Sequence, residues 1–290
     1  MPPATLPAMS DSIPTSDVIT VERSGHVTTV WLDRPDKLNA MGPPAWEELP
    51  RVMDTLSDDA ETRVIVIAAK GKAFTVGIDL VAFGPAFMAG GVDPDAPATS
   101  DVGKRMSTYR SIKRMQRTFT SIAECSKPVI AAIHGYCLGA GVDLITACDI
   151  RLAAADAVFS VRETKIAMVA DVGTMQRLPK VIDPGHVAEI VYTGKDFGAD
   201  EAAAMGLVNH VYADTDSLHK QAMAMAEEIA ANSPLAVQGS KAVLRAGEGR
   251  SIDEALDYMA VWNAAFIHSN DFAEAVMAFM QKRPPEFTGE

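Results

Sequence analysis

The chain has 290 residues, of which 48% are hydrophobic and 22% are charged, and these values suit one large folded domain or a domain with a helical appendage. The net charge of −12 argues against a nucleic-acid partner, because such a surface needs clustered Lys and Arg. The three cysteines lack metal-ligand spacing, and no run of about 18 apolar residues predicts a membrane-spanning helix.

The first residues, 1–16, predict a short disordered tail. No Lys or Arg precedes Arg23, so the basic start of a secretory signal and the Arg-rich pattern of a transit peptide are both missing. The last residues, FTGE, do not form a peroxisomal signal of the SKL type. We therefore expect a cytoplasmic location.

The first third of the chain predicts strands and one helix. Alternating β-branched residues at 18–23 and 27–33 predict a hairpin around a Ser-Gly turn. A loop leads to a helix over 44–57. The run RVIVIAA at 63–69 is continuously apolar, which is typical of a buried strand.

The middle of the chain predicts alternating strands and helices. Residues 84–103, rich in Gly, Pro, Asp and Ala, predict an irregular excursion, and 104–123 predict a helix. The run KPVIAAIHG at 127–135 predicts another buried strand, and YCLGAGVDLITAC after it resembles a helix start made of small residues. Short strands are expected at 149–153 and 157–161.

From about residue 184 the pattern is mostly helical, through Phe279. Strands joined by helical crossovers predict an α/β fold. We expect a core at 17–210 and a helical region at 211–290. The Met and Trp residues of that region favour packing, in part against another subunit.

Two Gly-containing turns directly follow predicted buried strands, FTVGID at 74–79 and HGYCLGAG at 134–141. Such turns expose free N–H groups where a helix begins, and two of them directed at one point would form an oxyanion hole. A purely structural role stays open, because Gly-rich turns are common. A phosphate-loop motif is absent, and Leu144 occupies the third glycine position of a dinucleotide-binding fingerprint.

Three acids lie among apolar residues: Asp143, Glu163 and Asp171. Burial raises carboxyl pKa values, and neighbouring carboxylates push them apart, which yields an acid and a base near neutral pH. The sequence has no G-x-S-x-G motif for a catalytic serine, and its histidines show no i, i+4 pairing on a helix, the spacing that a helical metal site would need. The structural alternative is helix capping or ion pairing with Arg151, Arg162 or Arg177.

Several segments together resemble the crotonase (enoyl-CoA hydratase/isomerase) superfamily over about residues 18–285. They are FTVGIDL, KPVIAAIHGYCLGAGVDLITACDIRLA, VFSVRETKIAMVADVGTMQRLP and ADEAAAMGLVNHV. The resemblance implies a crotonase-like (ClpP/crotonase) α/β spiral of ββα units with a C-terminal helical trimerisation region. It also implies an acyl-CoA thioester substrate, no separate cofactor or metal, and a homo-oligomer that is a trimer or a dimer of trimers.

Carried over by position, the resemblance places the oxyanion-hole amides at Ile78 and Ala140, where members usually have Gly at the second position. Residues expected to bind the CoA or acyl part are Lys37, Val76, Gly77, Asp79, Leu80, Gly141, Phe279 and Lys282.

Within this superfamily, hydratases carry two glutamates at the places of Asp143 and Glu163 and Gly at the place of Asp171. The three acids here instead resemble those of delta(3,5)-delta(2,4)-dienoyl-CoA isomerases. That likeness implies proton transfer between carbons 2 and 6 by Glu163 and Asp171, with Asp143 orienting them, in fatty-acid β-oxidation. The alternatives are an enoyl-CoA hydratase and a non-catalytic or RNA-binding relative; the acids and the charge argue against the latter.

Overall fold

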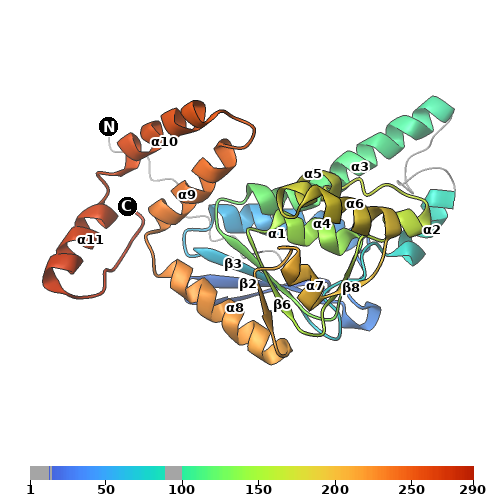
Figure 1. Cartoon of the computed structure of the whole chain (residues 1–290), viewed down its shortest axis with the longest axis horizontal. Coiled ribbons are helices and arrows are strands. Elements are labelled where there is room, and N and C mark those ends of the chain that lie inside the picture. Colours follow the sequence, from blue (N-terminus) through green and yellow to red (C-terminus); the bar gives the residue numbers. More distant parts are fainter. Residues whose placement is uncertain (1–12, 14, 89–99) are drawn as a thin grey trace.

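The computed structural model describes residue 13, residues 15–88 and residues 100–290. Its centre is a six-stranded sheet in the order β1-β2-β3-β4-β6-β9 (Figure 1). The first two strands form the predicted antiparallel hairpin, and the other neighbours are parallel. The strands are β1 (Ile19–Ser24), β2 (Val27–Leu32), β3 (Val64–Ala69), β4 (Val129–Ile133), β6 (Ile150–Ala154) and β9 (His210–Tyr212). The predicted α/β class is confirmed.

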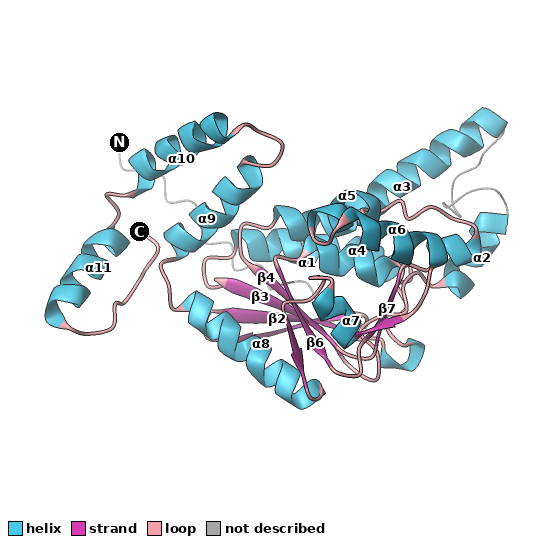
Figure 2. Cartoon of the chain, viewed as in Figure 1, coloured by secondary structure: helices cyan, strands magenta, loops and turns pink. Residues whose placement is uncertain are grey.

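Helices cover both faces of this sheet (Figure 2). One face packs against α1 (Pro43–Asp58), α3 (Asp101–Glu124) and α4 (Ala140–Ala147). The other face packs against α8 (Thr215–Ala230). Both sides of β3 and β4 are therefore buried, which explains why their sequences, VIVIAA and VIAAI, show no polar alternation.

A smaller three-stranded sheet has the order β5-β7-β8. Its strands are β5 (Tyr136–Leu138), β7 (Val158–Ser160) and β8 (Phe197–Gly198). The chain twice passes from the large sheet to the small sheet and then into a helix, through β4, β5 and α4 and through β6, β7 and the 3-10 helix η2 (Glu163–Ile166). These are the strand-strand-helix units that were predicted. The remaining elements of the core are η1 (Pro35–Lys37), α2 (Leu80–Met88), α5 (Thr174–Arg177), η3 (Leu178–Lys180), α6 (Pro184–Thr193) and α7 (Ala199–Ala204).

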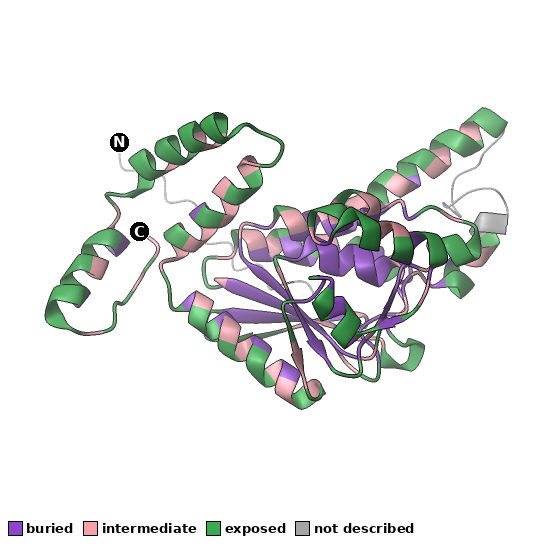
Figure 3. Ribbon diagram, in the orientation of Figure 1, coloured by how far each residue is buried: buried purple, intermediate pink, exposed green. Residues whose placement is uncertain are grey.

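The last three helices extend away from the sheet (Figure 1) and are largely exposed (Figure 3). They are α9 (Pro234–Ala246), α10 (Ile252–Phe266) and α11 (Asn270–Gln281). Each begins after a serine whose hydroxyl accepts a backbone N–H in the first turn. The predicted helical character after residue 184 is confirmed, except for β8 and β9, and the division of the chain at residue 210 stays a prediction.

The predicted irregular excursion over 84–103 differs from the structure at both ends, and residues 89–99 lie outside the described residues. Helix α2 continues to residue 88, and α3 begins at residue 101. The Asp79 carboxylate accepts the N–H groups of Val81 and Ala82, and Ser100 accepts the N–H of Gly103. The Ser100 cap stabilises the start of α3, which the Gly and Pro content obscured, and the Asp79 cap stabilises the start of α2, which precedes the predicted excursion.

No helix in the described part of the chain has both the length and the apolar character needed to cross a bilayer.

Candidate active site

The two Gly-containing turns lie against each other. Thr75 and Cys137 form a parallel bridge, and the Leu138 N–H donates to the Thr75 carbonyl at 3.0 Å. Gly77 has φ of +86°, and a Cβ there would lie 2.7 Å from the Leu138 oxygen and 3.3 Å from the Ala140 nitrogen. Glycine is thus required at 77 both by backbone conformation and by the close approach of the second turn.

The N–H groups of Ile78 and Ala140 lie in these turns and have no acceptor among the described residues. Ile78 bridges Met41, but the bonds of that bridge use its neighbours: the Met41 N–H donates to Gly77, and the Asp79 N–H donates to Met41. Ala140 is the first residue of α4, where N–H groups have no intrahelical partner. Both residues line one cavity, so two N–H groups without an acceptor lie at its wall.

This central cavity has a volume of about 690 Å³ and is mainly apolar. Its walls come from α1, the loop before α2, α3, the start of α4, η2 and the loop before α5. The lining residues are Trp46, Val76, Gly77, Ile78, Leu80, Thr108, Ile112, Met115, Leu138, Gly139, Ala140, Arg162, Glu163, Ile166, Met168, Asp171 and Val172. A small set of polar groups in an apolar cavity is typical of a site that orients a ligand.

The three acids gather at this cavity but differ in position. Glu163 and Asp171 line it, whereas Asp143 on α4 is fully buried and does not. One Asp143 oxygen accepts the backbone N–H of Thr174, the first residue of α5, at 2.5 Å, a contact of the kind named above as the structural alternative. The Glu163 carboxylate lies close to the second turn, because a Cβ at Gly139 would be 3.3 Å from its Oε1.

The surroundings raise the pKa of all three carboxyls. Burial raises the pKa of Asp143 to about 6, although the Thr174 hydrogen bond and the Arg177 charge oppose it. Burial, followed by the charge of Asp143, raises the pKa of Glu163 to about 7. Burial also raises the pKa of Asp171. Glu163 can therefore both accept and donate a proton near neutral pH.

Helix α3 holds the loop that carries Asp171. The Gln116 side-chain amide donates to the Asp171 carbonyl oxygen at 2.7 Å. Arg177 bridges the same loop to this helix, donating to the Val172 carbonyl at 3.4 Å and to the Thr120 hydroxyl at 3.1 Å. The other two arginines considered as partners of the acids bind elsewhere, Arg151 to backbone carbonyls and Arg162 to Asp196.

The residues expected to bind CoA divide into two groups. Val76, Gly77 and Leu80 line the central cavity. The others do not: Lys37 is exposed on η1, the Asp79 side chain caps α2 and binds Arg34, Gly141 packs against Thr75 and Cys137, and Phe279 and Lys282 belong to the end of α11. Helix α11 lies on the opposite side of the molecule from α2 and α3 (Figure 1). Within one chain, therefore, the terminal helix does not reach the cavity.

Several lining residues were missed from the sequence, notably Trp46 on α1 and Thr108, Ile112 and Met115 on α3. The three α3 residues recur at spacings of four and three, which places them on one face of a helix. That spacing was a usable signal. Their orientation toward the two turns is not local information, because α3 and the turns are distant in the sequence.

Among the described residues, no group of three or more His, Cys, Asp or Glu side chains is arranged to hold a metal ion. The predicted absence of a cofactor stays a prediction.

The chain is similar to known proteins over most of its length. The chain matches the model of the enoyl-CoA hydratase/isomerase family over residues 22–290 and belongs to that family. It is 45% identical over 260 residues to the mitochondrial Delta(3,5)-Delta(2,4)-dienoyl-CoA isomerase of Rattus norvegicus, covering 89% of this chain and 77% of that one. It is 40% identical over 278 residues to the peroxisomal isomerase of the same name from Arabidopsis thaliana, covering 96% and 98%.

A crystal structure of enoyl-CoA hydratase from Bacillus anthracis superposes with a TM-score of 0.83 at 31% identity, covering 94% of this chain and 100% of that chain. The crotonase-like fold is thus confirmed, as is the resemblance to the dienoyl-CoA isomerases.

Proposed function

We propose that the protein isomerises 3,5-dienoyl-CoA to 2,4-dienoyl-CoA. The observation that carries this proposal is the pairing of two raised-pKa carboxyls, Glu163 and Asp171, with two free N–H donors in one apolar cavity. The relatives that carry the isomerase name support the same activity.

In the proposed reaction the thioester oxygen accepts hydrogen bonds from the Ile78 and Ala140 N–H groups. One carboxylate removes a proton from carbon 2, and the electron pair of that C–H bond forms the 2,3 double bond through a dienolate held by the two donors. The 3,4 π electrons become the 4,5 double bond, and the 5,6 π electrons form the new C–H bond at carbon 6 with a proton from the other carboxyl group, which is left as a carboxylate. The substrate gains and loses one proton, so no oxidant or reductant is consumed.

Two carboxyls suit this shift because carbons 2 and 6 lie about 5 Å or more apart, beyond the hydrogen-bond reach of one side chain in a fixed pose. Asp143 is assigned an orienting role. It is buried on α4, the helix that begins at Ala140, and after burial its charge is the next largest cause of the raised pKa of Glu163. This leaves Glu163 with a pKa near 7, where either direction of proton transfer is accessible.

The test is an ultraviolet assay of the purified protein with 3,5-octadienoyl-CoA beside crotonyl-CoA. We expect 2,4-dienoyl absorbance to grow while the crotonyl signal changes little. Rapid loss of the crotonyl signal with no diene shift would instead support hydration. Enoyl-CoA hydration is the second candidate function, because Asp143 and Glu163 occupy the positions at which hydratases carry two glutamates.

We further propose a homo-oligomer, a trimer or a dimer of trimers. Large apolar side chains are exposed along the last three helices, among them Leu244, Val261, Phe279 and Met280, and exposed apolar surface of this kind favours association. Because α11 does not reach the cavity of its own chain, the expected contribution of Phe279 and Lys282 to CoA binding requires a second copy.

The cellular role is also a proposal. The isomerase activity suits fatty-acid β-oxidation, and the substrate supplies the coenzyme A, so no separate cofactor is needed. A cytoplasmic location stays a prediction, since the named relatives are mitochondrial or peroxisomal. The net charge of −12 supports the expectation that nucleic acid is not a partner.

A further inference from the structure

The loop at residues 34–42, between β2 and α1, lies against the segment at 75–79 that carries Ile78. Hydrogen bonds of 2.7–3.2 Å join the two: Val76 N–H to the Leu38 carbonyl, Met41 N–H to the Gly77 carbonyl, Asp79 N–H to the Met41 carbonyl and the Thr75 hydroxyl to the Asn39 carbonyl. The loop at 34–42, called the supporting loop below, therefore runs beside the first turn and is hydrogen-bonded to it.

The loop holds an unusual backbone conformation. Leu38 and Asn39 have φ of 49° and 55°, values in the left-handed region that non-Gly residues seldom adopt. The Asn39 side chain stabilises it: its oxygen accepts the Arg34 N–H at 2.7 Å, and its amide donates to the carbonyls of Lys70 and Ala73 at 2.9 and 2.8 Å. The supporting loop is thus hydrogen-bonded both to the segment at 75–79 and, through Asn39, to the residues that follow β3.

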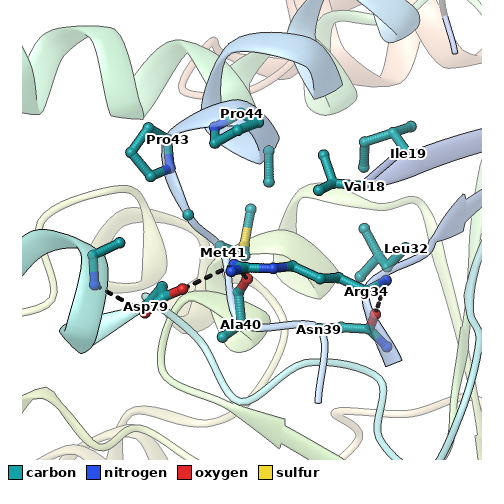
Figure 4. A pocket seen from close by; sticks show the side chains of 13 residues that line it. Val18, Ile19, Leu32, Arg34, Asn39, Ala40, Met41, Pro43, Pro44 and Asp79 are labelled. Atoms are coloured by element: carbon teal, nitrogen blue, oxygen red, sulfur yellow. Dashed lines mark hydrogen bonds and ion pairs between the residues drawn. The ribbon is translucent and has the colours of Figure 1, made fainter. Parts of the chain in front are cut away.

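An ion pair between Arg34 and Asp79 also joins the supporting loop to the first turn (Figure 4). One nitrogen of the Arg34 guanidinium donates to Asp79 Oδ2 at 2.8 Å and to the Ala40 carbonyl at 3.1 Å. Asp79 Oδ1 accepts the N–H groups of Val81 and Ala82. Both carboxylate oxygens are therefore occupied, one by the supporting loop and one by the start of α2.

The pair is sheltered from solvent. The exposed fractions of the Arg34 and Asp79 side chains are 29% and 10%. Burial pushes the pKa of Asp79 upward, but the hydrogen bonds from Ala82 and Arg34 outweigh it and keep the pKa below its usual range. Asp79 is therefore ionised at neutral pH, and its bond to the guanidinium is charge-assisted.

We propose that Arg34, acting through Asp79, is a positioning residue that fixes the direction of the Ile78 N–H toward the thioester oxygen. This inference rests on the proposed function, in which that N–H is an oxyanion donor. Ile78 lies between Gly77 and Asp79, whose backbones are both bonded to Met41. The Arg34 contact holds the side chain of Asp79 and the carbonyl of Ala40, the residues beside those bonds. Without it, the turn loses this side-chain restraint and is held to the loop by the four hydrogen bonds described above. A donor misplaced by a fraction of an ångström stabilises the dienolate less.

The test compares wild type, Arg34→Met, Arg34→Lys and Asp79→Asn. We expect Arg34→Met to lower kcat about 10- to 100-fold, since loss of a whole oxyanion donor costs about 10²–10³, while KM changes less than about threefold. Arg34→Lys keeps the charge and should recover part of the loss. Combining Arg34→Met with Asp79→Asn should cost no more than the larger single effect, because the two residues act through one contact.

A spectroscopic readout separates positioning from general loosening of the fold. Bound 2,4-dienoyl-CoA absorbs at longer wavelength when hydrogen bonds polarise its thioester carbonyl, and we expect Arg34→Met to reduce this red shift at saturating ligand. The matched control is Arg23→Met, which removes another Arg–Asp pair, that with Asp59, at a distance from the cavity. It should keep both kcat and the shift.

The outcomes distinguish the two proposals. An Arg34→Met protein with wild-type kcat and the full red shift would overturn the positioning role. Multiplicative effects of Arg34→Met and Asp79→Asn would also overturn it. A wild type that shows the red shift on binding, lost in Arg34→Met, but does not isomerise 3,5-dienoyl-CoA would overturn the proposed function and support the positioning of the donor.

Discussion

Three carboxyl groups that would be nearly equivalent in water have different properties here because their surroundings differ. Asp143 is fully buried and bonded to a backbone N–H. Glu163 faces the cavity with a pKa of about 7. Asp171 also faces the cavity, and its backbone is held by Gln116. The environment thus gives residues of one chemical type the different properties that the proposed orienting and proton-transferring roles require.

Replacing Asp171 tests the second proton-transfer site. We expect Asp171→Asn to lower kcat for 3,5-dienoyl-CoA about 10²–10⁴-fold, the usual range for removing a general acid or base, while the Kd for an acyl-CoA product changes little. Ultraviolet kinetics and calorimetric titration give the two quantities. Asp200→Asn, an exposed acid on α7, is the control. Near-normal turnover in Asp171→Asn would remove that residue from the mechanism.

The pH dependence of stability tests the surroundings of Glu163. Its pKa is about 7 in the folded protein against an ordinary 4.5. Proton binding therefore stabilises the folded state fully below pH 4.5, and that contribution is lost as pH rises through 7. Glu163→Gln cannot ionise, so its Tm should exceed that of wild type by roughly 2–6 °C at pH 8 and approach it at pH 5.

Differential scanning fluorimetry across this range measures the effect. Glu22→Gln, at an exposed position on β1, should show no such pH trend. A gap between Glu163→Gln and wild type that widens toward acid pH would contradict the raised pKa.

At the scale of elements, the size of the side chains where two helices meet decides how closely the helices can pack. Helices α9 and α10 meet at Gly239, where an added Cβ would lie 2.4 Å from Trp262 Nε1. Gly185 on α6 is the opposite case, since a Cβ there would meet nothing within 4 Å. The same substitution should therefore have opposite effects at these two helical glycines.

We expect Gly185→Ala to stabilise the protein by up to about 1 kcal/mol, because alanine is the better helix former. Gly239→Ala should destabilise it by about 1–3 kcal/mol through overpacking against Trp262. Chemical denaturation followed by tryptophan fluorescence measures both changes. A stabilised Gly239→Ala protein would show that the α9–α10 contact yields at no cost.

At the scale of the whole molecule, the sheet core is closed by helices on both faces, whereas α9 to α11 leave large apolar side chains exposed (Figure 3). An extension of this kind is stabilised when it is covered by another protein surface. This arrangement supports the proposed self-association and leaves the site dependent on a second copy for any contribution from α11.

Sedimentation or light scattering should give a native mass of three or six times the 30.9 kDa chain. Lys282→Ala should then raise KM several-fold without changing kcat much, because the residue would contact CoA and not the reacting carbons. A protein of single-chain mass with full activity would contradict both the assembly and the role of Lys282.

The sequence by itself determined what depends on neighbours along the chain. Continuous apolar runs specified β3 and β4, and the acids at 143, 163 and 171 indicated the proposed chemistry. Tertiary structure decided which of these groups share a cavity: it placed Glu163 and Asp171 on the wall, buried Asp143, turned Asp79 toward Arg34 and kept α11 away. Side-chain type and helical or strand periodicity are local properties, whereas contacts between distant segments depend on sheet register and helix packing across the whole chain.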